Sequence, residues 1–308
     1  MPVKKFQLTQ HAAEMASYYK ENGYVVIENC INDDDINQFL TAYERTKRSR
    51  TFVYYSQSIH KWIKPQLSSA GYIVESFENA TRLVNAPSFA QAIKKILFHE
   101  KISEALTAVS GFEQFVSWQD MFFDRSTGTI DHQDSWYLDT RPNGYLVGAW
   151  YALEDIHPEC GPFYVYPKSH ALPRLERHLD HDEFRKKSLD QITAAKITKE
   201  KAMLRKGDLL LWHPFLLHGS ESCENEAHSR KSFTSHFFPL GFARDMKGET
   251  SSPVEVLRRD LNRLEPTFNR NIFQIHDVNP YIFTGKGILK ALLQNREAIK
   301  DMRRSSYE

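Results

Sequence analysis

A histidine and an aspartate separated by one residue are the first feature of this chain that could carry out chemistry. His132 and Asp134 flank Gln133 in the segment TIDHQDSWYLDTR. In an extended chain, residues i and i+2 point to the same face, so the imidazole and the carboxylate would project together into one cavity. Two such ligands, completed by a distant histidine, form the 2-His-1-carboxylate triad that binds non-haem Fe(II). The alternative is a surface histidine beside a surface carboxylate.

The segment LLLWHPFLLHGS offers two histidines as the third ligand. His213 precedes Pro214, which favours extended geometry. His218, 86 residues after the first histidine, precedes Gly219 and Ser220, a turn-like pair that lets the backbone approach closely. On composition both histidines remain candidates, and we favour His218.

One arginine close to this segment in the sequence could bind a carboxylate. Arg230 opens the segment RKSFTSHFF, twelve residues after His218. A guanidinium at the far end of a cavity would bind both oxygens of a distal carboxylate, because its planar fork matches them. The alternative is a surface arginine beside Lys231. We expect His228 and His236 to be structural or exposed.

The elements that must position these residues are rich in β-branched and aromatic side chains and are separated by Gly and Pro. They follow a region with helical spacing of apolar residues. The expected strands lie at 116–123, 145–153, 161–166, 209–212 and 232–238. This pattern predicts a mainly β fold with flanking α-helices, in which two sheets of a jelly roll enclose a ligand cavity.

We expect one domain over residues 1–308. It would have a helical N-terminal part over about 1–111, a β core over about 112–240 and a helical C-terminal extension over about 241–308. A capping box at Ser252–Glu255 predicts a helix over 253–264, and a last helix is expected within 287–304. The charged insertion 171–200 is expected to be a solvated loop or helix, and it could also close over the cavity.

Composition excludes several classes of protein. Of the 308 residues 41% are apolar and 13% aromatic, which is enough for a substantial core. Forty basic residues nearly balance 39 acidic ones, so the charge balance gives no support for a nucleic-acid or membrane-surface partner.

The cysteines and the termini bear on the compartment. Cys30, Cys160 and Cys223 are an odd number without CxxC spacing, and they predict free thiols in a reducing compartment. The N-terminal segment MPVKKFQLTQ lacks the apolar core of a signal peptide, and no apolar run of 18 residues could span a membrane. We therefore expect a cytoplasmic protein.

Five motifs in a fixed order resemble the phytanoyl-CoA dioxygenase family, with the similarity extending over roughly residues 20–240. They are HQD at 132–134, AWYALED at 149–155, GPFYVYPKSH at 161–170, GDLLLWHPFLLHGS at 207–220 and SRKSFTSHFF at 229–238. The resemblance implies a double-stranded β-helix, which is a jelly-roll, cupin-like core. It also implies an oxygenase that depends on Fe(II), 2-oxoglutarate and O2.

Carried over by position, the iron ligands of the family fall on His132, Asp134 and His218. The resemblance places the contacts to 2-oxoglutarate, in chain order, on Gln119, Trp150, Ser220 and Arg230. Related halogenases replace the carboxylate with a small residue, so the aspartate disfavours halogenation. The activity implied is oxidation of an unactivated C–H bond, by hydroxylation, cyclisation or desaturation, with release of succinate and CO2.

The substrate is expected to be a small metabolite or a natural-product intermediate, because no extended basic patch for the phosphates of coenzyme A stands out. Trp136, Tyr137 and Arg141 follow the metal motif and could line the cavity mouth; the alternative is a solvated rim. Two other functions stay open, a catalytically silent jelly-roll binding protein and a cupin-type metal enzyme that does not use 2-oxoglutarate. The sequence does not decide the oligomeric state.

Overall fold

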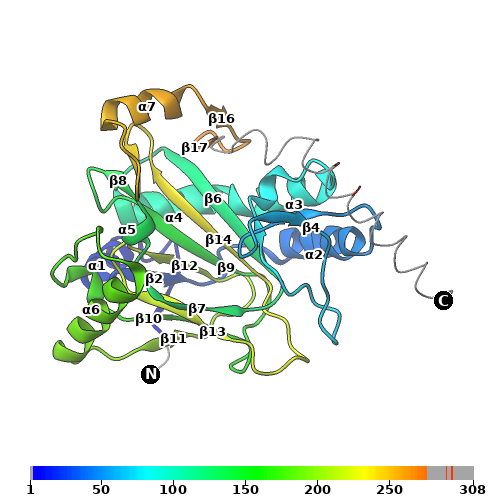
Figure 1. Cartoon of the computed structure of the whole chain (residues 1–308), viewed down its shortest axis with the longest axis horizontal. Coiled ribbons are helices and arrows are strands. Elements are labelled where there is room, and N and C mark those ends of the chain that lie inside the picture. The colour runs from blue at the N-terminus through cyan, green and yellow to red at the C-terminus, as the bar shows by residue number, and fades with distance from the viewer. Residues whose placement is uncertain (1–2, 276–288, 290–292, 294–308) are drawn as a thin grey trace.

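Two β-sheets carry the fold in the computed structural model, which describes residues 3–275, 289 and 293 (Figure 1). The major sheet contains, in spatial order, β1 (Lys5–Phe6), β2 (Tyr24–Ile27), β12 (Leu209–Trp212), β9 (Val147–Ala152), β14 (Ser232–Pro239), β6 (Phe115–Phe123), β5 (Phe77–Glu78), β3 (Tyr54–Ser56) and β4 (Lys61–Ile63). The minor sheet contains β11 (Glu200–Ala202), β10 (Phe163–Val165), β13 (His218–Ser222) and β7 (Thr127–His132). Their arrangement confirms the expected double-stranded β-helix.

Shorter strands extend this core. β17 (Ile272–Ile275) joins the edge of β6 in parallel and pairs with β16 (Leu264–Pro266). A separate ribbon is formed by β8 (Leu138–Arg141) and β15 (Ala243–Met246). The segment after residue 240, which we expected to be helical, therefore also contributes strands, and the N-terminal part contributes β1 to β5.

Helices cover the outer face of the major sheet. The helices of this layer are α1 (Ala12–Asn22), α2 (Asp33–Lys47), α3 (Pro87–Leu97) and α4 (Glu100–Ser110). Three further helices, α5 (Asp134–Tyr137), α6 (His181–Ala194) and α7 (Pro253–Leu261), lie outside it. The ring of Phe39 on α2 lies 5.3 Å from that of Phe122 and 5.1 Å from that of Phe233, and all three side chains are fully buried. These aromatic contacts fix the helical layer to the sheet.

Alternation along the strands separates two cores. Ala149 and Tyr151 on β9 belong to the core beneath the helices, whereas Trp150 between them belongs to a second apolar cluster with Phe163 and Trp212. Successive strand residues point to opposite faces, so the major sheet is buried on both sides. The second cluster lies on the side of the major sheet that the minor sheet covers.

Local sequence explains where two of the expected helices begin. The Asn32 side chain accepts the backbone N–H of Asp35 at 2.8 Å and caps α2. Ser252 and Glu255 form the predicted capping box of α7. The insertion 171–200 forms α6, and the helix expected within 287–304 lies outside the described residues except for positions 289 and 293.

The prediction of three free thiols is wrong. Cys160 and Cys223 lie opposite each other in an antiparallel bridge and form a disulfide, and Cys30 is the free cysteine. The expectation of a reducing compartment depended on three free thiols, so the disulfide removes its support. Within the described part of the chain, no helix is both long and apolar enough to cross a membrane.

Candidate metal and cosubstrate site

One strand pair brings the predicted metal ligands together. His132 ends β7, Asp134 begins α5, and His218 begins β13. β13 pairs antiparallel with β7, and the two histidines are opposite each other in its register. Residues directly opposite in an antiparallel pair lie on the same face, so the long gap in sequence closes at one point of the minor sheet.

The three side chains converge within reach of a single ion. Asp134 Oδ1 lies 3.6 Å from His132 Nε2 and 3.5 Å from His218 Nε2. All three ligand atoms are within 4.8 Å of one another. Neighbouring ligands of an ion bound at about 2.1 Å are roughly 3 Å apart, so small side-chain adjustments suffice. Two imidazoles and one carboxylate on one side, with room left for other ligands, are the donor set of non-haem Fe(II) oxygenases.

Backbone carbonyl groups orient both imidazoles for this role. His132 Nδ1 donates to the carbonyl oxygen of Ile130 at 2.9 Å, and His218 Nδ1 donates to that of Leu216 at 2.9 Å. With Nδ1 bonded to a carbonyl group, each Nε2 is directed towards the point near Asp134 where an ion would lie, and in the neutral ring it can serve as a ligand. Burial lowers the pKa of His218 to about 3, so this ring is neutral and available as a ligand at neutral pH.

Two side chains of the major sheet contact the other carboxylate oxygen of Asp134, Oδ2. Trp212 Nε1 donates to Asp134 Oδ2 at 2.7 Å, and His236 Nε2 lies 3.4 Å from the same oxygen. Burial raises the pKa of Asp134, but the surrounding imidazoles of His218, His236 and His132 outweigh it and hold the pKa well below its usual value. The carboxylate is thus ionised and presents Oδ1 to the ion.

A glycine makes room for the ring of Trp212. A Cβ atom at Gly148 would lie 2.1 Å from the ring of Trp212, so only glycine fits beside the indole. Gly148 pairs with Trp212 on β12 and with His236 on β14. The two side chains that contact the aspartate therefore lie on either side of this glycine. The register of three strands therefore positions Asp134 Oδ2.

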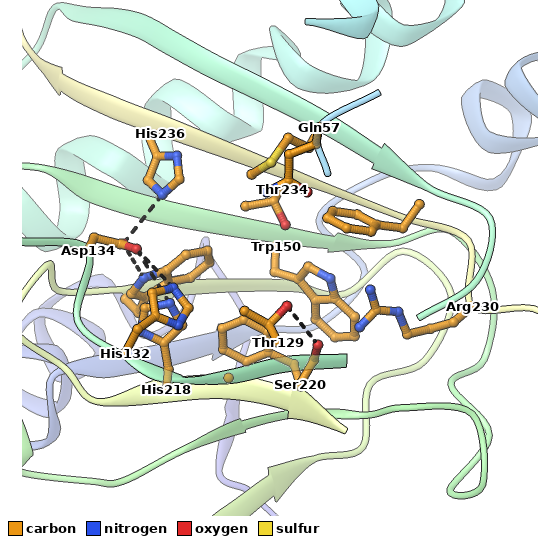
Figure 2. A pocket seen from close by; sticks show the side chains of 15 residues that line it. Gln57, Thr129, His132, Asp134, Trp150, His218, Ser220, Arg230, Thr234 and His236 are labelled. Carbon is orange, nitrogen blue, oxygen red and sulfur yellow. Dashed lines mark hydrogen bonds and ion pairs between the residues drawn. The ribbon is translucent and has the colours of Figure 1, made fainter. Parts of the chain in front are cut away.

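Arg230 lies at the opposite end of the same cavity from the three ligands, with Thr129 and Ser220 between them (Figure 2). Arg230 as a whole is 3% exposed, and its Nη1 donates to the carbonyl oxygen of Gly161 at 3.0 Å. It also contacts the faces of Phe123 and Trp150, whose ring centroids are 5.2 Å and 5.5 Å away. Within the described residues no carboxylate forms an ion pair with it. A buried cation without an anion is costly, so this end of the cavity fits an anionic ligand.

The cavity also holds two of the other predicted cosubstrate residues. Trp150 lines its floor, and the Ser220 hydroxyl donates to Thr129 Oγ1 at 3.3 Å. Gln119 does not line the cavity, because its side chain is hydrogen-bonded to Glu78. The role predicted for Gln119 in binding the cosubstrate has no direct contact to support it.

The predicted substrate residues lie outside the cavity wall. Tyr137 Oη is 2.9 Å from Nε2 of His181 on α6, and the ring of Tyr137 is 6.1 Å from that of His132. Trp136 donates to the carbonyl oxygen of Leu179 at 3.2 Å. Arg141 forms an ion pair with Asp245 at 3.1 Å and is half exposed. Tyr137 and Trp136 connect the metal side of the cavity to α6 and the residues just before it, and Arg141 does not.

Several residues of the site were not found from the sequence. His236, expected to be structural or exposed, is buried and points at the aspartate; Gln57, Phe163, Trp212 and Thr234 also line the cavity. The alternation of side chains along β12 could have indicated Trp212 as a cavity residue, because Trp212 is on the face opposite Leu211. His213, the alternative third ligand, packs against Tyr19 and Phe215 instead.

A second group of potential metal ligands lies near the disulfide. His157, Glu159 and His228 have ligand atoms within 4.8 Å of one another. The two imidazole rings stack with centroids 3.8 Å apart. This cluster is partly exposed and does not belong to the cavity.

Two solved structures with a similar fold contain 2-oxoglutarate, and one of them also contains iron. The epimerase SnoN, in complex with Fe3+, alpha ketoglutarate and nogalamycin RO, has a TM-score of 0.58 at 16% identity and covers 85% of this chain and 98% of its own. EctD from S. alaskensis, with 2-oxoglutarate and 5-hydroxyectoine, has a TM-score of 0.56 at 15% identity and covers 85% and 87%. At these identities the similarity establishes the double-stranded β-helix of this class.

The sequence comparisons identify the family. The phytanoyl-CoA dioxygenase (PhyH) family model matches residues 19–232, and the chain belongs to this family. The peroxisomal phytanoyl-CoA dioxygenase of Mus musculus is 24% identical over 244 residues, which are 73% of this chain and 67% of that protein. The Homo sapiens protein is 24% identical over 265 residues, or 79% and 73%. The expected enzyme class is confirmed: this is an oxidoreductase that uses Fe(II), 2-oxoglutarate and O2.

Proposed function

We propose that the chain oxidises an unactivated C–H bond of a small metabolite or a natural-product intermediate. Fe(II) at this site would, together with 2-oxoglutarate and O2, supply the oxidant, and 2-oxoglutarate would be converted to succinate and CO2. His132, Asp134 and His218 hold the ion, and Arg230 binds the distal carboxylate of 2-oxoglutarate. The observation that carries this proposal is a buried guanidinium, with no ion pair among the described residues, in the same cavity as a 2-His-1-carboxylate set.

The protein itself contributes by positioning the metal ligands and by enclosing the reacting atoms. The two carbonyl-bound imidazoles and the doubly held carboxylate keep their donor atoms directed at one point before the ion arrives. Trp150 and Phe163 provide an apolar wall between that point and Arg230, with their rings 5.5 Å apart. An apolar wall excludes water from the reacting atoms, so the carbon that is oxidised is selected by its distance and orientation.

Two other functions make different predictions. A catalytically silent binding protein would keep the fold and bind neither Fe(II) nor 2-oxoglutarate. A cupin-type enzyme independent of 2-oxoglutarate would bind the ion but would not need Arg230. Halogenation remains disfavoured, because Asp134 occupies the position at which a halide would need space.

Anaerobic reconstitution with Fe(II) and 2-oxoglutarate tests the proposal. We expect a weak visible charge-transfer absorption that requires both additions, and substrate-dependent succinate release once O2 is admitted. Arg230→Ala should raise the KM for 2-oxoglutarate on the order of 100-fold, because it removes a buried charged partner. The matched control is Arg205→Ala at an exposed position. Iron binding without any effect of 2-oxoglutarate would favour the cupin-type enzyme.

We also propose a cytoplasmic location and no nucleic-acid or membrane partner. The near-zero net charge of +1 supports the absence of a polyanionic partner. Fractionation of the cells that express the protein tests the location, and recovery in an organelle or in the medium would contradict it.

A further inference from the structure

Glu78 places a carboxylate on the cavity face of the major sheet. It is the last residue of β5 and pairs directly with Met121 on β6, which in turn pairs with Thr234 on β14. Directly opposite residues of antiparallel strands share a face. Met121 and Thr234 both line the cavity; Glu78 lies on the same face one strand farther out, beside the lining residues and not itself one of them. Strands are about 4.8 Å apart, which puts the Glu78 backbone roughly 10 Å from that of Thr234.

In the part of the chain that the structure describes, no lysine or arginine balances the charge of this carboxylate. Its hydrogen-bond partners are amides: Asn79 Nδ2 donates at 3.5 Å and the Gln119 side chain donates as well. Within the described residues no lysine or arginine forms an ion pair with it, and the nearest basic influence is the imidazole of His60, which is exposed. Burial is the main reason that its pKa is raised. An ionised Glu78 therefore lacks compensation that a ligand could supply.

Other acidic residues on or next to strands β6 and β7 differ in this respect. Asp131 forms an ion pair with Arg185 at 2.9 Å, and Asp124 lies 3.4 Å from Lys231 Nζ. Asp120 accepts two hydrogen bonds from Thr81, and it is fully buried. Glu78 combines partial exposure, a place on the cavity face and the absence of a fixed cation.

Gln57 adds a donor beside it. Gln57 lines the cavity on the side opposite Thr129 and Ser220, close to Thr234 (Figure 2). Its Oε1 accepts the hydroxyl of Ser76 at 2.9 Å, which leaves the Nε2 hydrogens to face the cavity without a protein acceptor in the described residues. An oxygen acceptor on a ligand would satisfy them.

We propose that Glu78 binds an ammonium group of the substrate and that Gln57 donates to an oxygen acceptor on the same molecule. The substrate is thus an amine of the amino-acid type. This inference rests on the proposed function, since Arg230 takes the 2-oxoglutarate and leaves Glu78 as the charged group for the substrate. A polyanionic acyl-CoA would meet a like charge here and would bind poorly.

Paired probes test this directly. Protein loaded anaerobically with Fe(II) and 2-oxoglutarate is titrated with N-alkyl amino acids, with their N-acetyl counterparts, in which the nitrogen is neutral, and with a branched acyl-CoA. We expect at least one N-alkyl member to bind at least 10-fold more tightly than its acetylated partner, and to stimulate succinate release in air. Equal affinity within every pair, including no binding of either member, overturns the proposal, as does preferential turnover of the acyl-CoA.

Two substitutions assign the effect to Glu78. Glu78→Gln should abolish the preference for the ammonium member, and Glu78→Asp should retain part of it. Glu75→Gln is the matched control, because Glu75 is three residues earlier and its carboxylate already accepts hydrogen bonds from the hydroxyls of Ser56 and Ser58. A preference unchanged in Glu78→Gln contradicts the assignment. Absence of the Fe(II)–2-oxoglutarate absorption before any probe is added would instead refute the proposed function.

Discussion

Two clusters of histidine and carboxylate on this chain have nearly the same composition and very different surroundings. The buried cluster has His132 and His218 beside Asp134, with their Nδ1 atoms bound to carbonyl oxygens. In the exposed cluster, His157 Nδ1 accepts the backbone N–H of Glu159 at 3.2 Å, so that lone pair is already used. The side chains of these two residues are 39% and 55% exposed.

The difference shows that residue types in proximity are not sufficient for a metal site. The rings of His132 and His218 are tilted by 52°, which lets both Nε2 atoms point at one place. The rings of His157 and His228 are nearly parallel, at 15°, so a single ion cannot lie in both ring planes without rotation of a side chain. Water also competes at the exposed cluster. We expect only the buried cluster to bind Fe(II) tightly.

The largest effect expected from this comparison is complete loss of iron. His132→Ala should reduce the bound Fe(II) to background and succinate release by more than about 100-fold, because it removes one of three protein ligands. His228→Ala removes the corresponding residue of the exposed cluster and should leave both unchanged. Iron content after anaerobic loading with one equivalent of Fe(II), together with a succinate assay, gives the readout. Loss of iron in His228→Ala would mean that the exposed cluster is also a site.

The disulfide beside the exposed cluster should affect stability and not chemistry. Cys160→Ser with Cys223→Ser removes a cross-link between residues 63 apart, and we expect the free energy of unfolding to fall by about 2–4 kcal/mol. Iron content should not change. Denaturant unfolding measures the first, and thiol titration of the denatured wild type checks the bond itself. One reactive thiol before reduction and three after it are expected, and three before reduction would contradict the disulfide.

The sequence predicted the residues that converge at the two ends of the cavity, and it did not predict the residues that hold them in place. His132 and Asp134 are two residues apart, and the ordered motifs added His218 and Arg230, so local pattern was enough. Trp212 and His236 reach the aspartate only because β12, β9 and β14 align in one register. Such a register depends on the whole sheet and leaves no local pattern. The cysteine pair was missed for the same reason.

Trp212 tests how much this support contributes. Trp212→Phe keeps an aromatic ring but removes the N–H that donates to Asp134 Oδ2, and we expect the Fe(II) affinity to fall about 10- to 100-fold. Trp136→Phe is the control, since it also removes an indole hydrogen bond to an oxygen, the carbonyl of Leu179, away from the ligands. Competition with a chelator measures both affinities. Equal losses in the two variants would show that the effect is general destabilisation.

His236 should contribute less, because its Nε2 is 3.4 Å from the oxygen that Trp212 Nε1 approaches to 2.7 Å. A longer contact is weaker, so His236→Phe alone should reduce Fe(II) affinity only about fivefold, near 1 kcal/mol. The two donors share one acceptor, however, and either one alone still restrains the carboxylate. The double variant should therefore lose more than the sum of the single losses, by about 0.5 kcal/mol or more. A double-mutant cycle on Fe(II) affinity measures this coupling, and strict additivity would mean that the two donors hold Asp134 independently.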